Sequence, residues 1–363
     1  MARILQVFRP RTGGTFGHVR VLAAELTARG HEVAVCGPGG GGFGVPLLEA
    51  PIPRSPEPAA SWRAIRAVGG AYRTFEPDLI HAHGAQAGIV ARLARAAEPR
   101  VPLVHTPHRY PFDDGTGPSP SHLAYEAVER ALMPLATRVL CVCEAERRIA
   151  VRLGVGDRAR VVYNGIDRLE PGPPEPRFAA FAEKGPLIVA VSELFRRKGV
   201  PLLIAAMPSV LSSFPDARLV VAGEGPDRKE AEQMRDRLGL CDRVHLVGHV
   251  DRPGALVALA DVFVNPALAE SFPYGILEAM AQACPCVVTD AGGSAEAIAD
   301  GHTGLVVPTG DSTALAAAVT RLLADHDLAD QLGVAAKAKV GERFTRERMV
   351  AGTEDVYAEL LGG

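Results

Sequence analysis

The sequence predicts an α/β protein that consists of two doubly wound, Rossmann-like domains. Short apolar runs alternate with helical patterns along the whole chain of 363 residues, which is typical of parallel sheets with crossover helices. A proline-rich segment, Pro171–Pro176, interrupts this alternation near the middle and is interpreted as a linker. A chain of this length also favours two domains over one.

The first half contains several short apolar runs that predict strands, with helical patterns between them. The expected strands lie near Ile4–Phe8, Glu32–Cys36, Leu79–His81, Leu103–His105, Arg138–Cys143 and Val161–Tyr163. The clearest helical patterns are His18–Ala28, Gln86–Ala96 and His122–Leu135.

The second half repeats this alternation. Its expected strands are Leu187–Ser192, Arg218–Ala222, Val244–Val247, Val262–Asn265, Cys286–Thr289 and Leu305–Val307. Helices are expected at Val200–Ser212, Asp227–Arg237, Gly254–Ala260, Gly275–Gln282 and Ser294–Ile298, and throughout the region from Ser312 onward. Because ligands of doubly wound sheets bind at the carboxyl ends of the strands, two such domains that face each other predict a cleft.

Composition and charge narrow the classes of function. A net charge of −3 argues against general affinity for nucleic acid, which requires a strongly basic face. No apolar run approaches the roughly 20 residues that span a bilayer, and the opening MARILQVF predicts a buried strand and not a signal peptide. Two cysteine pairs, Cys141 with Cys143 and Cys284 with Cys286, alternate along expected strands, which predicts small buried residues in a reducing cytoplasm.

The most informative segment runs from Glu270 to Glu278, within NPALAESFPYGILEAMAQACPCVVTDAGG. Glu270 lies in the turn before an expected helix, and Glu278 is expected to open that helix. The N–H groups at a helix N-terminus suit a phosphate, and a carboxylate suits hydroxyl groups because it accepts two hydrogen bonds at once. A phosphate flanked by hydroxyl groups describes a nucleotide sugar. On spacing alone, the alternative is two solvated glutamates on an amphipathic helix.

The whole segment resembles the E-x7-E signature of the family 4 glycosyltransferases, in the variant with Phe and Pro after the first glutamate. The resemblance implies that Glu270 holds hydroxyl groups of the donor sugar and that Glu278 holds the ribose. It also implies donor contacts for Phe272, Gly275 and Ile276.

Two segments of the first half resemble motifs of the same family. In GGTFGHV, the resemblance implies that Gly14 belongs to a loop that lies over the donor phosphates. In LVHTPHRY, it implies that His108 approaches the donor sugar, with Arg109 in place of the usual small residue. His105 is the rival for this role because it occupies the last strand position, and a purely structural histidine remains the other alternative.

The segment IVAVSELFRRKGVPLL resembles the family's turn from strand to helix, whose cations neutralise the leaving pyrophosphate. Lys198 and Gly199 match this turn, but Glu193 stands where the family has arginine. We expect Lys198 and either Arg196 or Arg197 to face the pyrophosphate. Glu193 should then turn aside and pair with one of these cations. The alternative is that Lys198 acts with helix N-termini alone.

Three shorter matches support the resemblance. Gly223, in VVAGEGP, matches a Gly-x-Gly-Pro turn near the donor. Val250 ends HLVGHV, which resembles the loop whose backbone meets the nucleotide base. Asn164 and Gly165, in VVYNGID, match the strand end that precedes the crossing between domains.

The resemblance implies a GT-B fold and a retaining hexosyltransferase of the cytoplasm. Residues 1–170 would form the acceptor-side domain and 171–343 the nucleotide-sugar domain, with 344–363 a helix that returns to the first domain. It implies no metal and no cofactor beyond the donor, which we expect to be a UDP-sugar, with a GDP-sugar as the alternative. The acceptor hydroxyl could belong to a glycan, a lipid-linked sugar or a small molecule. A peripheral membrane contact and the oligomeric state stay open.

Three other interpretations stay in view. A nicotinamide-dependent oxidoreductase would need the spacing G-x-G-x-x-G in the first turn, which this chain lacks. A sugar-nucleotide-binding subunit without activity is suggested by Glu193. A hydrolysing nucleotide-sugar epimerase of the same fold would release nucleotide without an acceptor.

Overall fold

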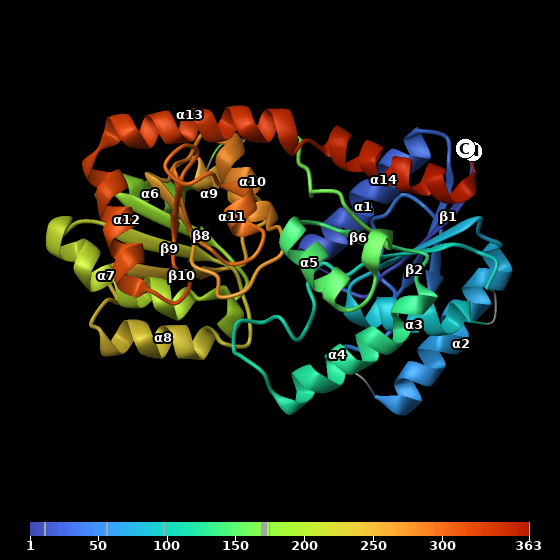
Figure 1. Cartoon of the computed structure of the whole chain (residues 1–363). Coiled ribbons are helices and arrows are strands. Elements are labelled where there is room, and N and C mark those ends of the chain that lie inside the picture. The colour runs from blue at the N-terminus through green and yellow to red at the C-terminus, as the bar shows by residue number, and fades with distance from the viewer. Residues whose placement is uncertain (11, 56, 97–98, 168–172, 174, 363) are drawn as a thin grey trace. The chain divides into compact units, whose positions relative to one another are not determined.

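The computed structural model describes the chain except for residues 11, 56, 97–98, 168–172, 174 and 363. It contains two compact α/β units (Figure 1). The first comprises Met1–Asp113, Gly117–Asn164 and Glu347–Gly363, and the second comprises Asp114–Thr116 and Gly165–Arg346. The chain therefore changes unit at Asn164–Gly165, before the expected boundary at residue 170. Residues 171, 172 and 174 of the expected linker lie outside the described residues.

The first unit is built on a parallel sheet of seven strands in the order β3-β2-β1-β4-β5-β6-β7. Six of these strands overlap the expected ones, and the edge strand β3 was not expected because it has only three residues. The strands are β1 (Arg3–Val7), β2 (Glu32–Gly37), β3 (Leu47–Glu49), β4 (Leu79–His83), β5 (Leu103–Thr106), β6 (Arg138–Cys141) and β7 (Ala159–Val161).

Two strand ends of the first unit correct the expected boundaries. β7 ends at Val161, so most of the expected strand Val161–Tyr163 is wrong. Val162 packs instead on the last helix, where a Cβ added to Gly352 would lie 3.3 Å from its Cγ2. β6 ends before Cys143, which is the N-cap residue of the next helix and accepts a hydrogen bond from the Glu146 N–H. All six cysteines are free, and both expected pairs are buried.

Helices flank the first sheet, and the last helix of the chain is among them. They are α1 (Gly14–Ala28), α2 (Pro58–Phe75), α3 (Ala85–Arg95), α4 (Pro120–Leu132), α5 (Glu144–Arg152) and α14 (Arg346–Leu361), with the short turns η1 (Met133–Leu135) and η2 (Gly156–Arg158). In Figure 1 the red α14 lies beside the blue α1. Arg29, which ends α1, forms ion pairs with Glu347 and Glu354 of α14. Val350 and Tyr357 share a buried apolar cluster with Leu22. The expected return of the last helix to the first domain is confirmed.

The second unit has a parallel sheet of six strands in the order β10-β9-β8-β11-β12-β13, and all six were expected. They are β8 (Leu187–Val191), β9 (Arg218–Ala222), β10 (Val244–Gly248), β11 (Val262–Asn265), β12 (Cys286–Thr289) and β13 (Leu305–Val307). The inner strands are short Val- and Ile-rich runs buried on both faces, as a parallel sheet covered by helices requires.

The helices of the second unit follow the expected order, except that the first helix, Pro176–Ala182, was not expected and begins at the last residue of the expected linker. They are α6 (Pro176–Ala182), η3 (Arg196–Lys198), α7 (Val200–Ser213), α8 (Arg228–Arg237), α9 (Pro253–Val257), α10 (Tyr274–Ala281), α11 (Ser294–Ala297), α12 (Ser312–Ala324) and α13 (His326–Arg343). Among the described residues, no helix combines the length and the apolar character needed to cross a bilayer.

Candidate active site

Two residues from separate motifs meet in the second unit. Lys198 ends the turn η3, which follows β8, and Glu270 lies in the loop that follows β11. Because β8 and β11 are neighbours in a parallel sheet, both loops emerge at the same edge. The Lys198 ammonium group donates a hydrogen bond to the Glu270 carboxylate, and the two side chains are only 15% and 10% exposed. The structure therefore pairs the residue predicted to bind the sugar, Glu270, with the residue predicted to bind the phosphate, Lys198.

Backbone contacts hold the loop of Glu270 against the turn of Lys198. The carbonyl of Arg197 accepts hydrogen bonds from the N–H groups of Leu268, at 2.7 Å, and Ala269, at 3.3 Å. Gly199 has a left-handed φ of 66°, and a Cβ built on it would lie 1.9 Å from the carbonyl oxygen of Pro266. Only glycine lets the two loops approach so closely, which explains why glycine follows Lys198.

The structure shows which neighbouring cation lies closest to Glu193. The Glu193 carboxylate lies 3.6 Å from the guanidinium of Arg197, so Glu193 does pair with one of the neighbouring cations. Arg196 is exposed, and its backbone N–H donates to the Asp227 carboxylate at 2.6 Å. In the described part of the chain, no ion pair involves the Arg196 side chain.

Glu278 lies in the second turn of α10, which corrects the expectation that it opens that helix. Its side chain is half-buried, and burial raises the pKa of the carboxyl group to about 7 from the ordinary value of 4.5. Tyr274 stands one helical turn earlier, and burial together with the Glu278 charge raises the pKa of its hydroxyl group. A carboxyl group with so little hydration is suited to accept hydrogen bonds from a ligand.

Burial limits which atoms of two predicted donor-binding residues could contact a ligand. The side chains of Phe272 and Ile276 are 3% and 0% exposed, and the Phe272 ring packs edge-on against Phe344 at 5.0 Å. Both side chains therefore belong to the core, and only their backbone N–H groups could contact a ligand. Gly275 lies in the first turn of α10, where N–H groups lack partners within the helix.

The predicted Gly-x-Gly-Pro turn after β9 requires glycine because it packs closely against a neighbouring loop. A Cβ on Gly223 would lie 2.0 Å from the Ser192 carbonyl oxygen, and one on Gly225 would lie 2.3 Å from that of Leu194. The loops that follow β8 and β9 thus pack backbone against backbone. Val250 is buried at 7% exposure, in the loop that follows β10, so these three loops belong to the same sheet edge.

In the first unit, the glycine-rich loop is shorter than expected. Gly13 is the N-cap residue of α1, with φ 84°, and the helix begins at Gly14, so both Gly14 and Gly17 lie within its first turns. The helix carries His18, whose buried ring lies edge-on to the ring of His108, with centroids 4.7 Å apart. The loop and the predicted catalytic histidine are therefore neighbours.

The two candidate histidines, one inside β5 and one after it, have different surroundings. His108 lies in the loop that follows β5 with a left-handed φ of 52°, and its Nε2 lies 3.1 Å from Nδ1 of His83. His105 is inside β5, is fully buried, and lies against α3, where a Cβ on Gly88 would be 2.3 Å from its Nε2. His108 is half-buried and His105 is fully buried, which favours His108 for the predicted contact with the donor sugar.

Sequence reasoning missed a buried polar network beneath His108. Gln6 of β1 bonds Nε2 of His83 through its Oε1, at 2.6 Å, and donates from Nε2 to the hydroxyl of Tyr357, at 3.2 Å. The same hydroxyl lies 2.6 Å from Nδ1 of His81, and the other ring nitrogen of His81 lies 2.7 Å from Oγ1 of Thr106. The alternation His-Ala-His at the end of β4 was the available signal, because residues two apart share one face of a strand.

Burial favours the neutral form of the histidines in this region by lowering the pKa of each ring. Burial lowers the pKa of His18 to about 4, although a side-chain hydrogen bond with Asn164 raises it in part. Burial, followed by the neighbouring imidazoles, lowers the pKa of His83 and His108 well below the ordinary value. Neutral imidazoles can accept hydrogen bonds or bind a metal ion at pH 7 without first losing a proton.

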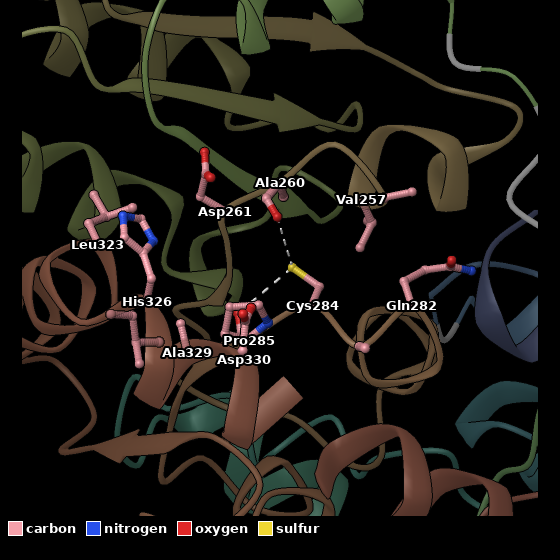
Figure 2. Close-up of a pocket in the computed structure, with 13 residues that line it drawn as sticks. Val257, Ala260, Asp261, Gln282, Cys284, Pro285, Leu323, His326, Ala329 and Asp330 are labelled. Carbon is pink, nitrogen blue, oxygen red and sulfur yellow. Dashed lines mark hydrogen bonds between the residues drawn. The ribbon is translucent and has the colours of Figure 1, made fainter. Parts of the chain in front are cut away.

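A separate cavity of roughly 240 Å³ lies in the second unit (Figure 2). Its lining includes Asp261 and Pro285, which directly precede β11 and β12, and His326 at the start of α13. In Figure 2 the thiol of Cys284 points toward the carbonyl oxygens of Ala260 and Pro285, at 3.6 and 3.8 Å. The cavity therefore opens at the amino ends of the strands and contains none of the predicted site residues.

Comparisons with known proteins agree with this geometry. The profile of the Glycosyl transferases group 1 matches residues 174–339, and that of Glycosyltransferase Family 4 matches residues 12–168. A phosphatidyl-myo-inositol mannosyltransferase of Mycobacterium leprae is 30% identical over 348 residues, which cover 92% of this chain and 89% of the relative. The chain belongs to the family 4 glycosyltransferases.

Solved structures of similar fold extend over the whole chain. The sucrose-phosphate synthase of Thermosynechococcus elongatus superimposes with a TM-score of 0.87 at 23% identity, covering 99% of both chains. Anabaena HepE, solved in complex with UDP-glucose, gives a TM-score of 0.84 at 22% identity, over 99% of this chain and 100% of HepE. The GT-B fold expected for this glycosyltransferase is therefore confirmed, and the oxidoreductase interpretation is excluded by the family.

Proposed function

We propose that this glycosyltransferase moves a hexosyl group from a nucleotide-diphosphate sugar to an acceptor hydroxyl, with retention of configuration and without a metal ion. The observation that carries the proposal is the ion pair between Lys198 and Glu270 at the carboxyl edge of the second sheet. It places a cation and a hydrogen-bond acceptor side by side, and a phosphate bonded to a sugar needs both.

Bound donor would exchange the partners of this pair. Glu270 would accept hydrogen bonds from hydroxyl groups of the sugar, and Lys198 would turn toward the pyrophosphate. Glu278 would accept hydrogen bonds from the two hydroxyl groups of the ribose. These hydrogen bonds would replace part of the hydration that its carboxyl group loses through burial. The N–H groups of Gly275 and Ile276 at the start of α10 suit the phosphate itself.

The chemistry follows from charge development on the leaving group. As the bond from the anomeric carbon to the phosphate oxygen breaks, negative charge grows on the pyrophosphate, and preorganised cations stabilise it. Because Arg197 already forms an ion pair with Glu193, we assign the second positive charge near the pyrophosphate to Arg196. The acceptor oxygen would bond the anomeric carbon from the same face while its proton passes to the departing phosphate oxygen. His108 would orient the sugar through its half-buried ring.

Retention through a covalent intermediate would require two carboxylates about 5 Å apart, one of them the nucleophile. Glu270, the acidic residue assigned to the sugar, is bound to Lys198, which favours a role in positioning. We therefore favour the front-face route, in which the enzyme contributes orientation and electrostatics.

Binding and turnover with a panel of nucleotide sugars test the proposal. UDP-glucose is the first donor to try, because HepE, which shares the fold, was solved with it. GDP- and ADP-sugars complete the panel, and a donor at 100 times its dissociation constant should stabilise the protein by about 2.7 kcal/mol. Transfer to added acceptors, with retained configuration by NMR and undiminished rate in EDTA, is the expected result. If no nucleotide sugar stabilises the protein, the proposal is wrong; nucleotide release that needs no acceptor would indicate the hydrolysing epimerase.

A further inference from the structure

Three histidines of the first unit converge on one point. His18 comes from α1, His83 ends β4, and His108 follows β5. Each offers a ring nitrogen, and these three nitrogens all lie within 4.8 Å of one another. One helix, one strand and one loop that are far apart in sequence thus present three imidazoles to the same small volume.

The separations suit a tetrahedral metal ion. Zinc binds imidazole nitrogen at about 2.0–2.1 Å, so two nitrogens of a tetrahedral site stand roughly 3.4 Å apart. Nδ1 of His83 and Nε2 of His108 are hydrogen-bonded to each other at 3.1 Å. A bound ion would replace this hydrogen bond, at a separation close to the tetrahedral value. The widest separation in the group would need to shorten by at most about 1.4 Å, which small rotations of a ring can supply.

Outer partners already orient two of the rings. The Gln6 amide oxygen lies 2.6 Å from Nε2 of His83, so it fixes the ring nitrogen that faces away from the group. His18 has a side-chain hydrogen bond with Asn164. Histidines that bind metal ions usually give their second ring nitrogen to such a partner. His18 and His83 are buried, whereas His108 is half-buried, so a fourth coordination position would face the more open side.

We propose that His18, His83 and His108 form a binding site for a divalent transition metal, with zinc as the preferred ion. Imidazole ligands select zinc, copper and nickel over magnesium and calcium. The ion is not required for sugar transfer. Instead it occupies His108, so a loaded site withdraws that ring from the donor sugar and inhibits turnover. The inhibitory consequence rests on the proposed function, but the binding site does not.

The binding test uses untagged, full-length protein in a Cys241→Ser background. Cys241 is the exposed thiol and lies 3.3 Å from the Asp236 carboxylate, so it is the main competing ligand for soft metals. Cobalt(II) titration followed by its visible absorption should show one ion per chain in a four-coordinate site, and zinc should displace it. His302→Ala is the matched control, because His302 is an exposed histidine of the second unit.

Single substitutions decide which residues bind the ion. His18→Ala or His108→Ala should weaken cobalt binding by more than the roughly 10–100-fold that loss of an outer partner costs. Gln6→Ala should fall within that 10–100-fold range. Thermal melting of each variant checks its folding, and His108→Ala is the safest variant because His108 is the least buried of the three.

The outcomes separate the site from the activity. Unchanged cobalt affinity in both His18→Ala and His108→Ala, or no absorption band in the parent protein, would overturn the proposal. Inhibition of transfer by stoichiometric zinc, reversed by EDTA and reduced in His18→Ala, is the expected kinetic result. If cobalt binds as described but no transfer is detected with any donor, the proposed function fails while the metal site stands. If zinc binds but does not inhibit, the site stands and only its effect on His108 is wrong.

Discussion

The replacement Glu278→Gln should stabilise the protein without ligand and weaken its binding of nucleotide. Burial raises the pKa of this carboxyl group from 4.5 to about 7. The folded protein therefore holds the proton more tightly than the unfolded chain does, and the free energy of unfolding falls as the pH rises from about 4.5 to about 7. A difference of roughly 2.5 pKa units corresponds to a penalty on the order of 3 kcal/mol above pH 7.

Glutamine at this position carries no charge at any pH. The variant should match the parent near pH 4.5 and exceed its stability at pH 8 by about 1–3 kcal/mol, because the amide still needs hydrogen bonds of its own. Urea unfolding at both pH values measures this difference. Glu342→Gln is the matched control: Glu342 is exposed on α13, so its removal should leave the pH dependence unchanged.

Nucleotide binding should change in the opposite direction. Loss of a charge-assisted hydrogen bond to the ribose should cost roughly 1.5–3 kcal/mol, seen by calorimetry for free nucleotide and nucleotide sugar alike. In the parent protein, affinity should fall as the pH drops below about 7, because the ligand must then displace the proton of Glu278. A folded Glu278→Gln variant with unchanged nucleotide affinity would refute the ribose role, and equal stability at pH 8 would refute the buried charge.

Five further substitutions test the rest of the site. Lys198→Ala should lower turnover by about a hundredfold or more, since it removes a preorganised cation, and full activity would contradict the assignment of η3 to the phosphates. Arg196→Ala should follow closely in kcat, whereas Arg197→Ala should be milder because Arg197 is neutralised by Glu193; the reverse order in kinetics would exchange the two roles. His108→Ala should cut turnover at least about tenfold with free-nucleotide affinity intact, and His105→Ala should lower the free energy of unfolding by about 2 kcal/mol or more. Collapse of turnover in the His105 variant alone would show that the motif register is wrong.

Most of the fold could be predicted from the sequence, because buried parallel strands appear in it as continuous apolar runs. Runs such as Val262–Asn265 have no polar alternation and lie between clear helical patterns, so their type and position were predictable. β3 was not predicted because its three residues, two half-buried leucines and an exposed glutamate, form no continuous apolar run. The end of β7 was misplaced because Val162 and Tyr163 have strand-forming side chains, yet Val162 serves the contact with α14, which depends on tertiary packing.

The site was predictable in its residue types and not in its contacts. Motif spacing could not reveal that Lys198 bonds Glu270, because 72 residues separate them and only the adjacency of β8 and β11 joins their loops. The raised pKa of Glu278 arises from burial alone, and burial on a helix of mixed faces cannot be read from one sequence. The family motifs identify His108, but His83 has no motif of its own and resembles an ordinary strand residue. Its contact with His108 depends on the hydrogen bond between Gln6 and the His83 ring and on the left-handed φ of His108, neither of which the sequence shows.

The departure at Glu193 can be understood from the charges in the same turn. An arginine at that position would add a fourth positive side chain to Arg196, Arg197 and Lys198 in one short turn. Glutamate instead pairs with Arg197, whose backbone carbonyl supports the loop of Glu270. In the proposed mechanism, Arg196 and Lys198 would then carry the charge for the leaving group. The double variant Glu193→Ala with Arg197→Ala should therefore keep more activity than Arg196→Ala alone. Equal losses would mean that the Glu193–Arg197 pair takes part in catalysis directly.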